Sequence, residues 1–204
     1  MEKAIAHDAN NILTVLIGYV DLLNDSVEEN NIDSIKKIVV RIKDTTERLT
    51  GCFKEITQSK IDIDVNQELV KLTTEYKKKD NRTYVNTNFA DGPKKLNMKR
   101  VHFDRIFGNL IKNAVEAPYS LTKHIEVATY HVNDVLKIEI SNDGKMIPDE
   151  IVSKIFEKGI STKGSTGLGL YSVQRTLSEL GGKVTCKSDK RKTCFTVSFR
   201  TERK

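Results

Sequence analysis

Two series of apolar residues at heptad spacing occupy the first 60 residues and constrain the fold more than any other feature. Steps of three and four residues alternate throughout both series. This spacing places one apolar seam along an α-helix and is typical of helices that pack against each other. The first seam comprises Ile5, Ala9, Ile12, Leu16, Tyr19 and Leu23, and the second comprises Ile35, Ile38, Ile42, Thr45, Leu49, Cys52 and Ile56.

A polar stretch between the two series, residues 24–31, indicates where the chain turns back. We therefore expect an antiparallel helical hairpin over residues 1–60. Two helices alone bury little apolar surface, so the regular seam predicts that two copies pair into a dimeric four-helix bundle. The alternative is that the hairpin packs against the remainder of its own chain.

Residues 61–204 alternate between strand and helix patterns, which predicts a second domain of layered α/β type. Period-two alternation and turn residues indicate strands at 61–64, 83–89, 125–132, 135–142, 184–188 and 194–200. Helical spacing indicates helices at 66–79, 101–117, 148–156 and 167–180. The expected domains are thus residues 1–60 and 61–204.

Composition narrows the class of protein. With 38% hydrophobic residues the chain can form a core, while its longest mostly apolar stretch, Ile12–Val20, is too short to span a membrane. The sequence opens without a signal-peptide pattern, and its three cysteines form no CxxC pair, which suits a reducing compartment. These features predict a cytoplasmic fragment without membrane contact.

The net charge of +6 is unevenly distributed, because residues 1–60 hold 8 basic and 10 acidic side chains whereas the rest hold 26 and 18. A basic second domain attracts nucleotide phosphates or an acidic partner protein. No basic run with interleaved aromatic residues occurs, so we do not expect nucleic acid as a partner.

Six of the eleven glycines fall within residues 159–182, and the segment 161–170 leads directly into a predicted helix. Free backbone N–H groups at a helix start bind phosphate, and glycine lets the phosphate approach closely. Lys163 would add a positive charge to such a site. The alternative is a flexible loop that ends in a helix cap.

Amide side chains mark two further places. Asn109 and Asn113 share one face of the predicted 101–117 helix, where an amide oxygen can serve as a ligand for Mg²⁺ or simply face solvent. Asn142 ends the buried row of the 135–142 strand, where a polar group needs a partner such as the edge of a nucleotide base. The alternative for Asn142 is a simple Asn-Asp-Gly turn.

His7 lies nearly opposite the seam of the first helix, at about 340° on a helical wheel against about 140° for the seam. A buried structural role is therefore disfavoured, and an ordinary exposed histidine is the alternative to a functional one. Asn11 shares its face, and Asp8 is adjacent.

These segments follow one another in a fixed order that resembles the catalytic core of a sensor histidine kinase of two-component signalling. The resemblance covers essentially the whole chain and rests on His7-Asp8, Asn109 to Asn113, Asn142 to Gly144, Phe156-Glu157 and Gly167 to Leu170. It implies a dimerisation and phosphoacceptor hairpin followed by an α/β sandwich, with a mixed sheet and three helices, that binds ATP and Mg²⁺.

The resemblance also implies a role for each matching residue. His7 matches the phosphoacceptor, Asp8 the acidic neighbour that polarises it, and Asn11 a residue that assists a reverse phosphatase reaction. Asn113 matches the Mg²⁺ ligand and an ATP-binding residue. The other expected ATP-binding residues are Asn109, Lys112, Asn142, Gly144, Ile147, Phe156, Thr162, Lys163, Gly167, Leu168, Gly169, Leu170 and Thr193.

The implied activity is ATP-dependent phosphorylation of His7 in a homodimer formed through residues 1–60, followed by transfer to an aspartate in the receiver domain of a response regulator. We expect a longer protein, anchored to a membrane through a region upstream of this fragment. Asn142 and Met146 depart from the family pattern, which has an aspartate and a second glycine there. The Asn142 oxygen can still accept a hydrogen bond from adenine.

These departures leave open a histidine phosphotransfer protein with a decayed nucleotide domain. A gyrase-like ATPase that uses the helices only for assembly would leave His7-Asp8 unexplained.

Overall fold

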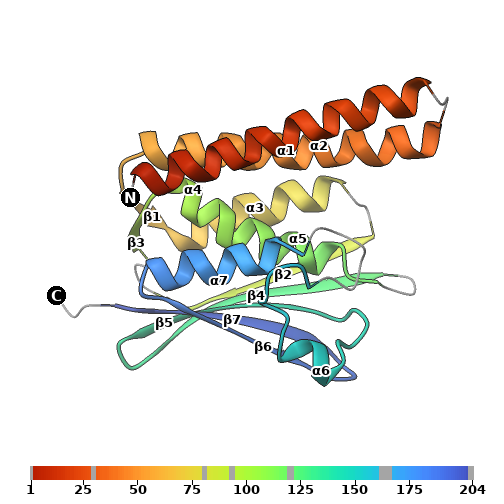
Figure 1. Ribbon diagram of the computed structural model, residues 1–204. Helices are drawn as coiled ribbons and strands as arrows, with labels where there is room; N and C mark the ends of the chain where they lie inside the picture. Colours follow the sequence, from red (N-terminus) through yellow and green to blue (C-terminus); the bar gives the residue numbers. More distant parts are fainter. Residues whose placement is uncertain are drawn as a thin grey trace. The chain divides into compact units, whose positions relative to one another are not determined.

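The computed structural model describes residues 2–28, 31–79, 82–91, 95–118, 122–160 and 167–201 (Figure 1). Within the helices, the side chains of residues 2–8, 28, 47–48, 52, 54–56 and 78–79 fall outside this description. The chain divides into two units, Met1–Ser59 and Lys60–Lys204, each with its own internal packing.

Helices α1 (Glu2–Glu28) and α2 (Ile32–Thr57) pack along each other in the first unit (Figure 1). Asn31 caps the N-terminus of α2, because its Oδ1 accepts the backbone N–H of Ser34 at 3.1 Å. Every described side chain of the two predicted seams is buried or half-buried. The buried seam positions are Ala9, Ile12, Ile38 and Thr45.

A five-stranded mixed sheet organises the second unit. Strand β2 (Thr83–Phe89) pairs with β4 (Lys123–Val132) in parallel, and all other neighbouring strands of the sheet are antiparallel. One edge strand, β6 (Lys183–Ser188), exposes Lys183 and Lys187. In spatial order the strands are β2 (Thr83–Phe89), β4 (Lys123–Val132), β5 (Val135–Asn142), β7 (Thr193–Arg200) and β6 (Lys183–Ser188).

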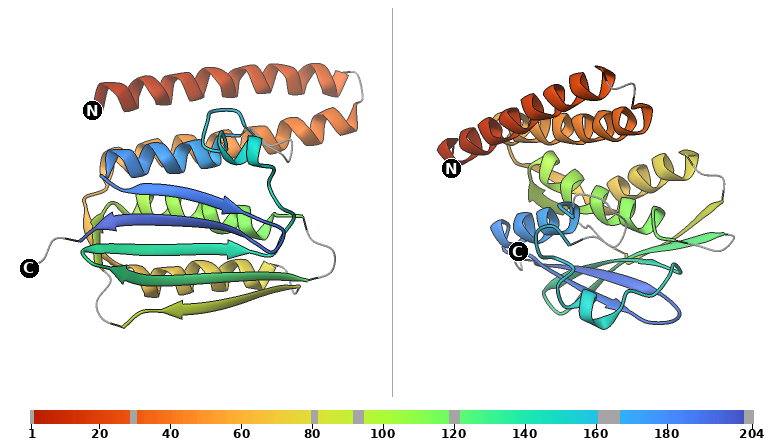
Figure 2. Two further views of the ribbon diagram at one scale, coloured as in Figure 1. Left: turned by 90° about the horizontal axis from the view of Figure 1, so that it is seen from below. Right: turned by 45° about the vertical axis from the view of Figure 1, so that its right-hand side comes forward.

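Three helices lie side by side on one face of this sheet (Figure 2). Alternate strand residues point toward them, and Leu136, Ile138 and Ile140 of β5 are fully buried there, as strand parity predicts. The sheet and its helical layer form the expected α/β sandwich. The helices are α3 (Val65–Lys79), α5 (Asn109–Val115) and α7 (Gly169–Glu179).

Two short elements differ from the sequence predictions. Strand β3 (Lys95–Met98), which no local pattern indicates, pairs antiparallel with β1 (Ile61–Asp64) in a separate two-stranded sheet. The helix expected over residues 148–156 is limited to α6 (Asp149–Val152), because the chain then turns and brings Ile155 into the core.

The helix predicted over residues 101–117 is interrupted. Helix α4 (Arg100–Phe103) continues through a π-helical segment, η1 (Asp104–Gly108), into α5. A π-helix closes i→i+5 hydrogen bonds, so it shifts the angular position of the residues that follow. At this junction the side chain of Asn109 donates from Nδ2 to the carbonyl oxygen of Arg105 at 2.6 Å, which fixes the orientation of the amide.

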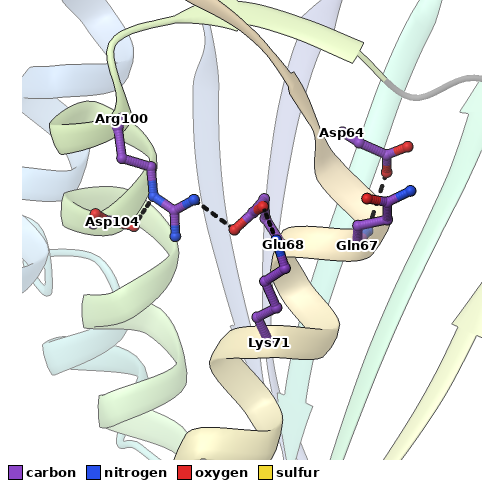
Figure 3. A network of polar contacts seen from close by, with 6 residues as sticks. All are labelled: Asp64, Gln67, Glu68, Lys71, Arg100 and Asp104. Atoms are coloured by element: carbon purple, nitrogen blue, oxygen red, sulfur yellow. Dashed lines mark hydrogen bonds and ion pairs between the residues drawn. The ribbon is translucent and has the colours of Figure 1, made fainter. Parts of the chain in front are cut away.

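A group of charged side chains connects α3 to the beginning of α4 (Figure 3). Glu68 accepts hydrogen bonds from Lys71 at 2.7 Å and from Arg100 at 2.5 Å. Arg100 also binds Asp104 at 2.8 Å. These contacts hold the pKa of the Glu68 carboxyl below its usual range, and the hydrogen bond from Lys71 has the largest effect.

Replacement of Glu68 by Gln is expected to lower the free energy of unfolding by about 1 kcal/mol at pH 7, because it removes a charged acceptor whose partners are partly exposed. Since the folded-state pKa lies below the unfolded value, this stabilisation is present above the unfolded pKa and disappears as the pH falls through the folded-state pKa. Urea unfolding at pH 7 and pH 3 measures the change. An equal difference at both pH values would contradict the charge-based explanation.

Candidate functional site

One end of the five-stranded sheet carries a row of uncharged polar side chains. The strand register places Asn142, the last residue of β5, opposite Thr193 on β7, which in turn lies opposite Ser188 on β6. Asn142 and Thr193 are buried, with 5% and 3% of their surface exposed. Buried polar groups need hydrogen-bond partners, so a buried Asn142 at the end of this row marks a candidate binding site.

The two hydroxyl groups of the row bond to each other. Ser188 Oγ lies 2.6 Å from Thr193 Oγ1, and the backbone N–H of Ile147 donates to Ser188 Oγ at 2.9 Å. These bonds tie the segment after β5 to β6. The sequence predictions did not include Ser188, although pairing the two final strands across residues 189–192 would have placed it opposite Thr193.

Asn142 and the adjacent Asp143 differ in burial and in hydrogen bonding. No hydrogen bond joins the Asn142 amide to another residue within the described ranges. A Cβ at Gly144 would lie 2.8 Å from Asn142 Nδ2 and 2.8 Å from the Cβ of Ala117, so glycine is required there. Asp143 is exposed, and its Oδ1 accepts the N–H of His124 at 2.9 Å. Asp143 thus closes the turn while Asn142 is buried.

Asn109, the first residue of α5, lies beside the start of α7. Asn109 and Asn113 are half-buried and one turn apart, and a Cβ at Gly169 would lie 3.1 Å from Asn109 Oδ1. The structure therefore brings together two segments that are distant in the sequence. Lys112, between the asparagines, is exposed, with its Nζ 3.9 Å from Glu116.

The backbone of Gly167 contacts the backbone of Gly159. Its φ is +63°, and its carbonyl oxygen accepts the N–H of Gly159 at 3.2 Å. A Cβ on Gly167 would lie 2.7 Å from the carbonyl oxygen of Gly159. The two glycines thus join the ends of the segment that contains Thr162 and Lys163, which were expected to bind phosphate and lie outside the described residues.

The expected apolar residues of the site belong to or border the core. Phe156 is half-buried and contacts Phe195 edge to face, with 6.3 Å between ring centroids. Ile147 and Leu170 pack against the core, and Leu168 is half-buried directly before α7. Packing of these side chains holds the neighbouring backbone in place.

The expected catalytic residues lie on α1 in the first unit. The backbone is helical from His7 to Asn11, so these two positions share one helix face. Asn11 is exposed, and the side chains of His7 and Asp8 lie outside the described part of the chain.

The described residues of the second unit suit a nucleotide. The N-terminus of α7 offers backbone N–H groups for phosphate, and the buried polar row offers donors and acceptors for a base. Asn113 carries the type of oxygen that Mg²⁺ accepts. Across the described ranges no three His, Cys, Asp or Glu side chains gather to hold a metal, so Mg²⁺ would depend on amide and phosphate oxygens.

The sequence matches one known family and several known proteins. Residues 98–203 match the family described as histidine kinase-, DNA gyrase B- and HSP90-like ATPase. The sensor protein VanS of Enterococcus faecium is 30% identical over 222 residues, covering 96% of this chain and 55% of VanS. VanSC of Enterococcus gallinarum is 28% identical, covering 95% of this chain and 58% of VanSC. The chain thus spans little more than half the length of these relatives.

Solved structures share the fold at low sequence identity. The catalytic domain of histidine kinase ThkA has a TM-score of 0.64 at 20% identity, over 70% of this chain and 96% of that domain. Histidine kinase AdeS of Acinetobacter baumannii has a TM-score of 0.62 at 19% identity, over 97% of this chain and 98% of AdeS. These similarities establish the α/β domain with its mixed sheet. Among the described helices, none has the length and apolar character to cross a membrane.

Proposed function

Because the chain belongs to the family of histidine kinase-, DNA gyrase B- and HSP90-like ATPases and is the catalytic core of a sensor histidine kinase, we propose that it phosphorylates His7 with ATP and passes the phosphoryl group to an aspartate of a response regulator. The observation that carries the proposal is the close approach of Asn109 on α5 to Gly169 at the start of α7, because these two helices are far apart in the sequence. Membership of a family of ATPases supports ATP as the substrate.

We assign residues 1–60 to dimerisation and phosphotransfer and residues 61–204 to ATP binding. The division of the chain at Ser59 supports this assignment. We further propose that the fragment acts in the cytoplasm as part of a longer, membrane-anchored sensor. The short length of the chain relative to VanS supports the longer protein.

Exposed apolar side chains support a homodimer through the first unit. Leu13, Ile17 and Val20 of α1 are exposed by 42%, 64% and 47%. Their spacing of four and three residues aligns them in a stripe beside the seam that contacts α2. Two copies that cover this stripe would form a four-helix bundle, in which apolar area is removed from water.

The proposed reaction begins with the neutral imidazole of His7. One ring nitrogen attacks the γ-phosphorus, a nitrogen–phosphorus bond forms, and the bond to the oxygen that bridges the β- and γ-phosphates breaks, releasing ADP. Asp8 accepts a hydrogen bond from the other ring nitrogen and stabilises the positive charge that develops on the ring. An aspartate of the response regulator then takes the phosphoryl group from His7.

The reverse phosphatase reaction would use Asn11. Its amide, one helical turn from His7, can orient a water molecule toward the acyl phosphate of the response regulator. The exposure of Asn11 on α1 supports access by a partner protein.

The second unit would hold ATP by its two ends. We propose that Asn142 and Thr193 contact the base and that the start of α7, with Lys163 and Thr162, contacts the phosphates. Asn113 would hold Mg²⁺, which neutralises phosphate charge when bound. Phe156 and Ile147 would line the space between the two ends.

Replacement of Asn113 by Ala is expected to weaken Mg²⁺-ATP binding roughly 10-fold, because it removes a metal ligand while the helix is retained. Calorimetric titration with ATP in the presence and absence of Mg²⁺ measures the change. The loss should be confined to the titration with Mg²⁺. Equal losses with and without the metal would move the metal ligand to another residue.

Incubation with γ-labelled ATP tests the proposed function directly. We expect acid-labile, base-stable phosphate on the protein, the behaviour of a nitrogen–phosphorus bond.

Asn142 also favours a second candidate, a histidine phosphotransfer protein that no longer binds ATP. Absence of label together with absence of ATP binding would support that candidate.

A further inference from the structure

We infer that the base site of this chain accepts 6-oxopurine nucleotides as well as ATP, and that Asn142 sets this tolerance. The inference rests on the proposed function, because it concerns the base end of the proposed ATP site. It is carried by the uncharged row of Asn142, Thr193 and Ser188 at the end of the sheet.

Asn142 can present a donor or an acceptor from the same place. Its amide has a carbonyl oxygen that accepts and an NH₂ group that donates, and rotation about the last side-chain bond exchanges them. Among the described residues no partner hydrogen-bonds to this amide. None of the described residues therefore fixes which of the two groups meets a ligand.

Glycine at position 144 keeps a side chain away from the Asn142 amide. The amide lies against Gly144, where even a methyl group would approach Nδ2 to 2.8 Å. An amide oxygen and an NH₂ group have similar size, so the clearance that glycine provides serves either one. The adjacent carboxylate of Asp143 is exposed and holds the N–H of His124, which excludes it from the buried row.

Thr193 is a second group in the row that can either donate or accept a hydrogen bond. Its hydroxyl lies 2.6 Å from Ser188 Oγ, which also accepts the N–H of Ile147. If Ser188 donates to Thr193, the Thr193 hydrogen remains available to donate, and a ligand can approach its oxygen as well. The hydroxyl can thus face either an acceptor or a donor.

The two purine classes differ at the atoms that such groups read. Adenine has an amino donor at carbon 6 and an unprotonated ring nitrogen 1, whereas hypoxanthine has a carbonyl acceptor at carbon 6 and an N–H at nitrogen 1. An amide and a hydroxyl can satisfy both patterns. A carboxylate only accepts, so it leaves two acceptors facing each other when carbon 6 carries an oxygen.

Calorimetric titration of the 204-residue chain with Mg²⁺-ATP and Mg²⁺-ITP tests the inference. ITP is the probe because it lacks the 2-amino group of GTP and thus isolates the atoms discussed. We expect wild-type dissociation constants within about 5-fold of each other. Asn142→Asp should shift the preference toward ATP by about 10-fold or more, the effect of facing two acceptors. Asn142→Ser, whose hydroxyl donates and accepts, should retain the wild-type ratio.

A matched control is Asn88→Asp, which adds the same charge at an exposed position of β2 and should leave the ratio unchanged. ATP binding with ITP at least about 100-fold weaker would overturn the inference and leave the proposed function intact. An unchanged ratio in Asn142→Asp, with melting temperature preserved, would also overturn it. Failure of both nucleotides to bind the wild type would overturn the inference and the proposed function together.

Discussion

A chain in which His7 is replaced by Gln is expected to bind ATP as the wild type does but to incorporate almost no γ-phosphate. Glutamine retains polarity and approximate length, yet it has no ring nitrogen that can act as a nucleophile. His7 lies in the first unit and the proposed nucleotide residues lie in the second, so the substitution should not change affinity. The rate of labelling should fall at least about 1,000-fold, as when a nucleophile is removed.

His131→Gln is the matched control, because His131 is exposed on β4 and takes no part in the proposed reaction. Labelling measured by filter binding with γ-labelled ATP, alongside calorimetric titration, separates chemistry from binding. Label on His7→Gln at the wild-type level would exclude His7 as the phosphoacceptor. Loss of label in both variants would point to a general effect of removing histidines.

Replacement of Gly167 by Ala is expected to weaken ATP binding roughly 30-fold. The backbone of Gly167 has φ +63°, which an L side chain adopts only with strain, and the new Cβ would overlap the backbone of Gly159. The strain and the forced displacement together cost about 2–4 kcal/mol. Because the displaced backbone leads into α7, the N–H groups proposed to bind phosphate would move.

Gly181 provides a control for the strain alone. Its φ is +70°, yet a Cβ there would meet no atom within 4 Å. Gly181→Ala should therefore lower the free energy of unfolding by about 1 kcal/mol and leave ATP affinity unchanged. Titration calorimetry and thermal unfolding of both variants measure the two effects. Equal affinity loss in both would show that left-handed strain, rather than the clash with Gly159, disturbs the site.

Sequence patterns predicted those parts of the fold that depend on local periodicity. The heptad positions of α1 and α2 whose side chains the structure describes are buried or half-buried, and the alternation of β5 correctly placed Asn142 in a buried row. The turn at Asn133-Asp134 was also predictable, because Asn tolerates the positive φ of 53° found there. In each case the prediction depends only on residues that are close together in the sequence.

Features that depend on distant residues could not be predicted in this way. Strand β3 exists because Lys95–Met98 pairs with β1, on the far side of α3 and β2 in the sequence. The π-helical segment η1 interrupts a pattern that reads as one helix. Ser188 joins the candidate site only through its register with Thr193 and its bond to Ile147. Such features emerge from tertiary packing, which overrides local preference.

The edge strand β6 carries exposed lysines at positions 183 and 187. Unpaired N–H and C=O groups along a strand edge invite another chain to continue the sheet, which is a route to aggregation. Two copies that met edge to edge at β6 would crowd four ammonium groups together, so the lysines oppose such growth. The second unit thus discourages uncontrolled association at this edge, while the uncharged stripe on α1 remains open to a defined partner.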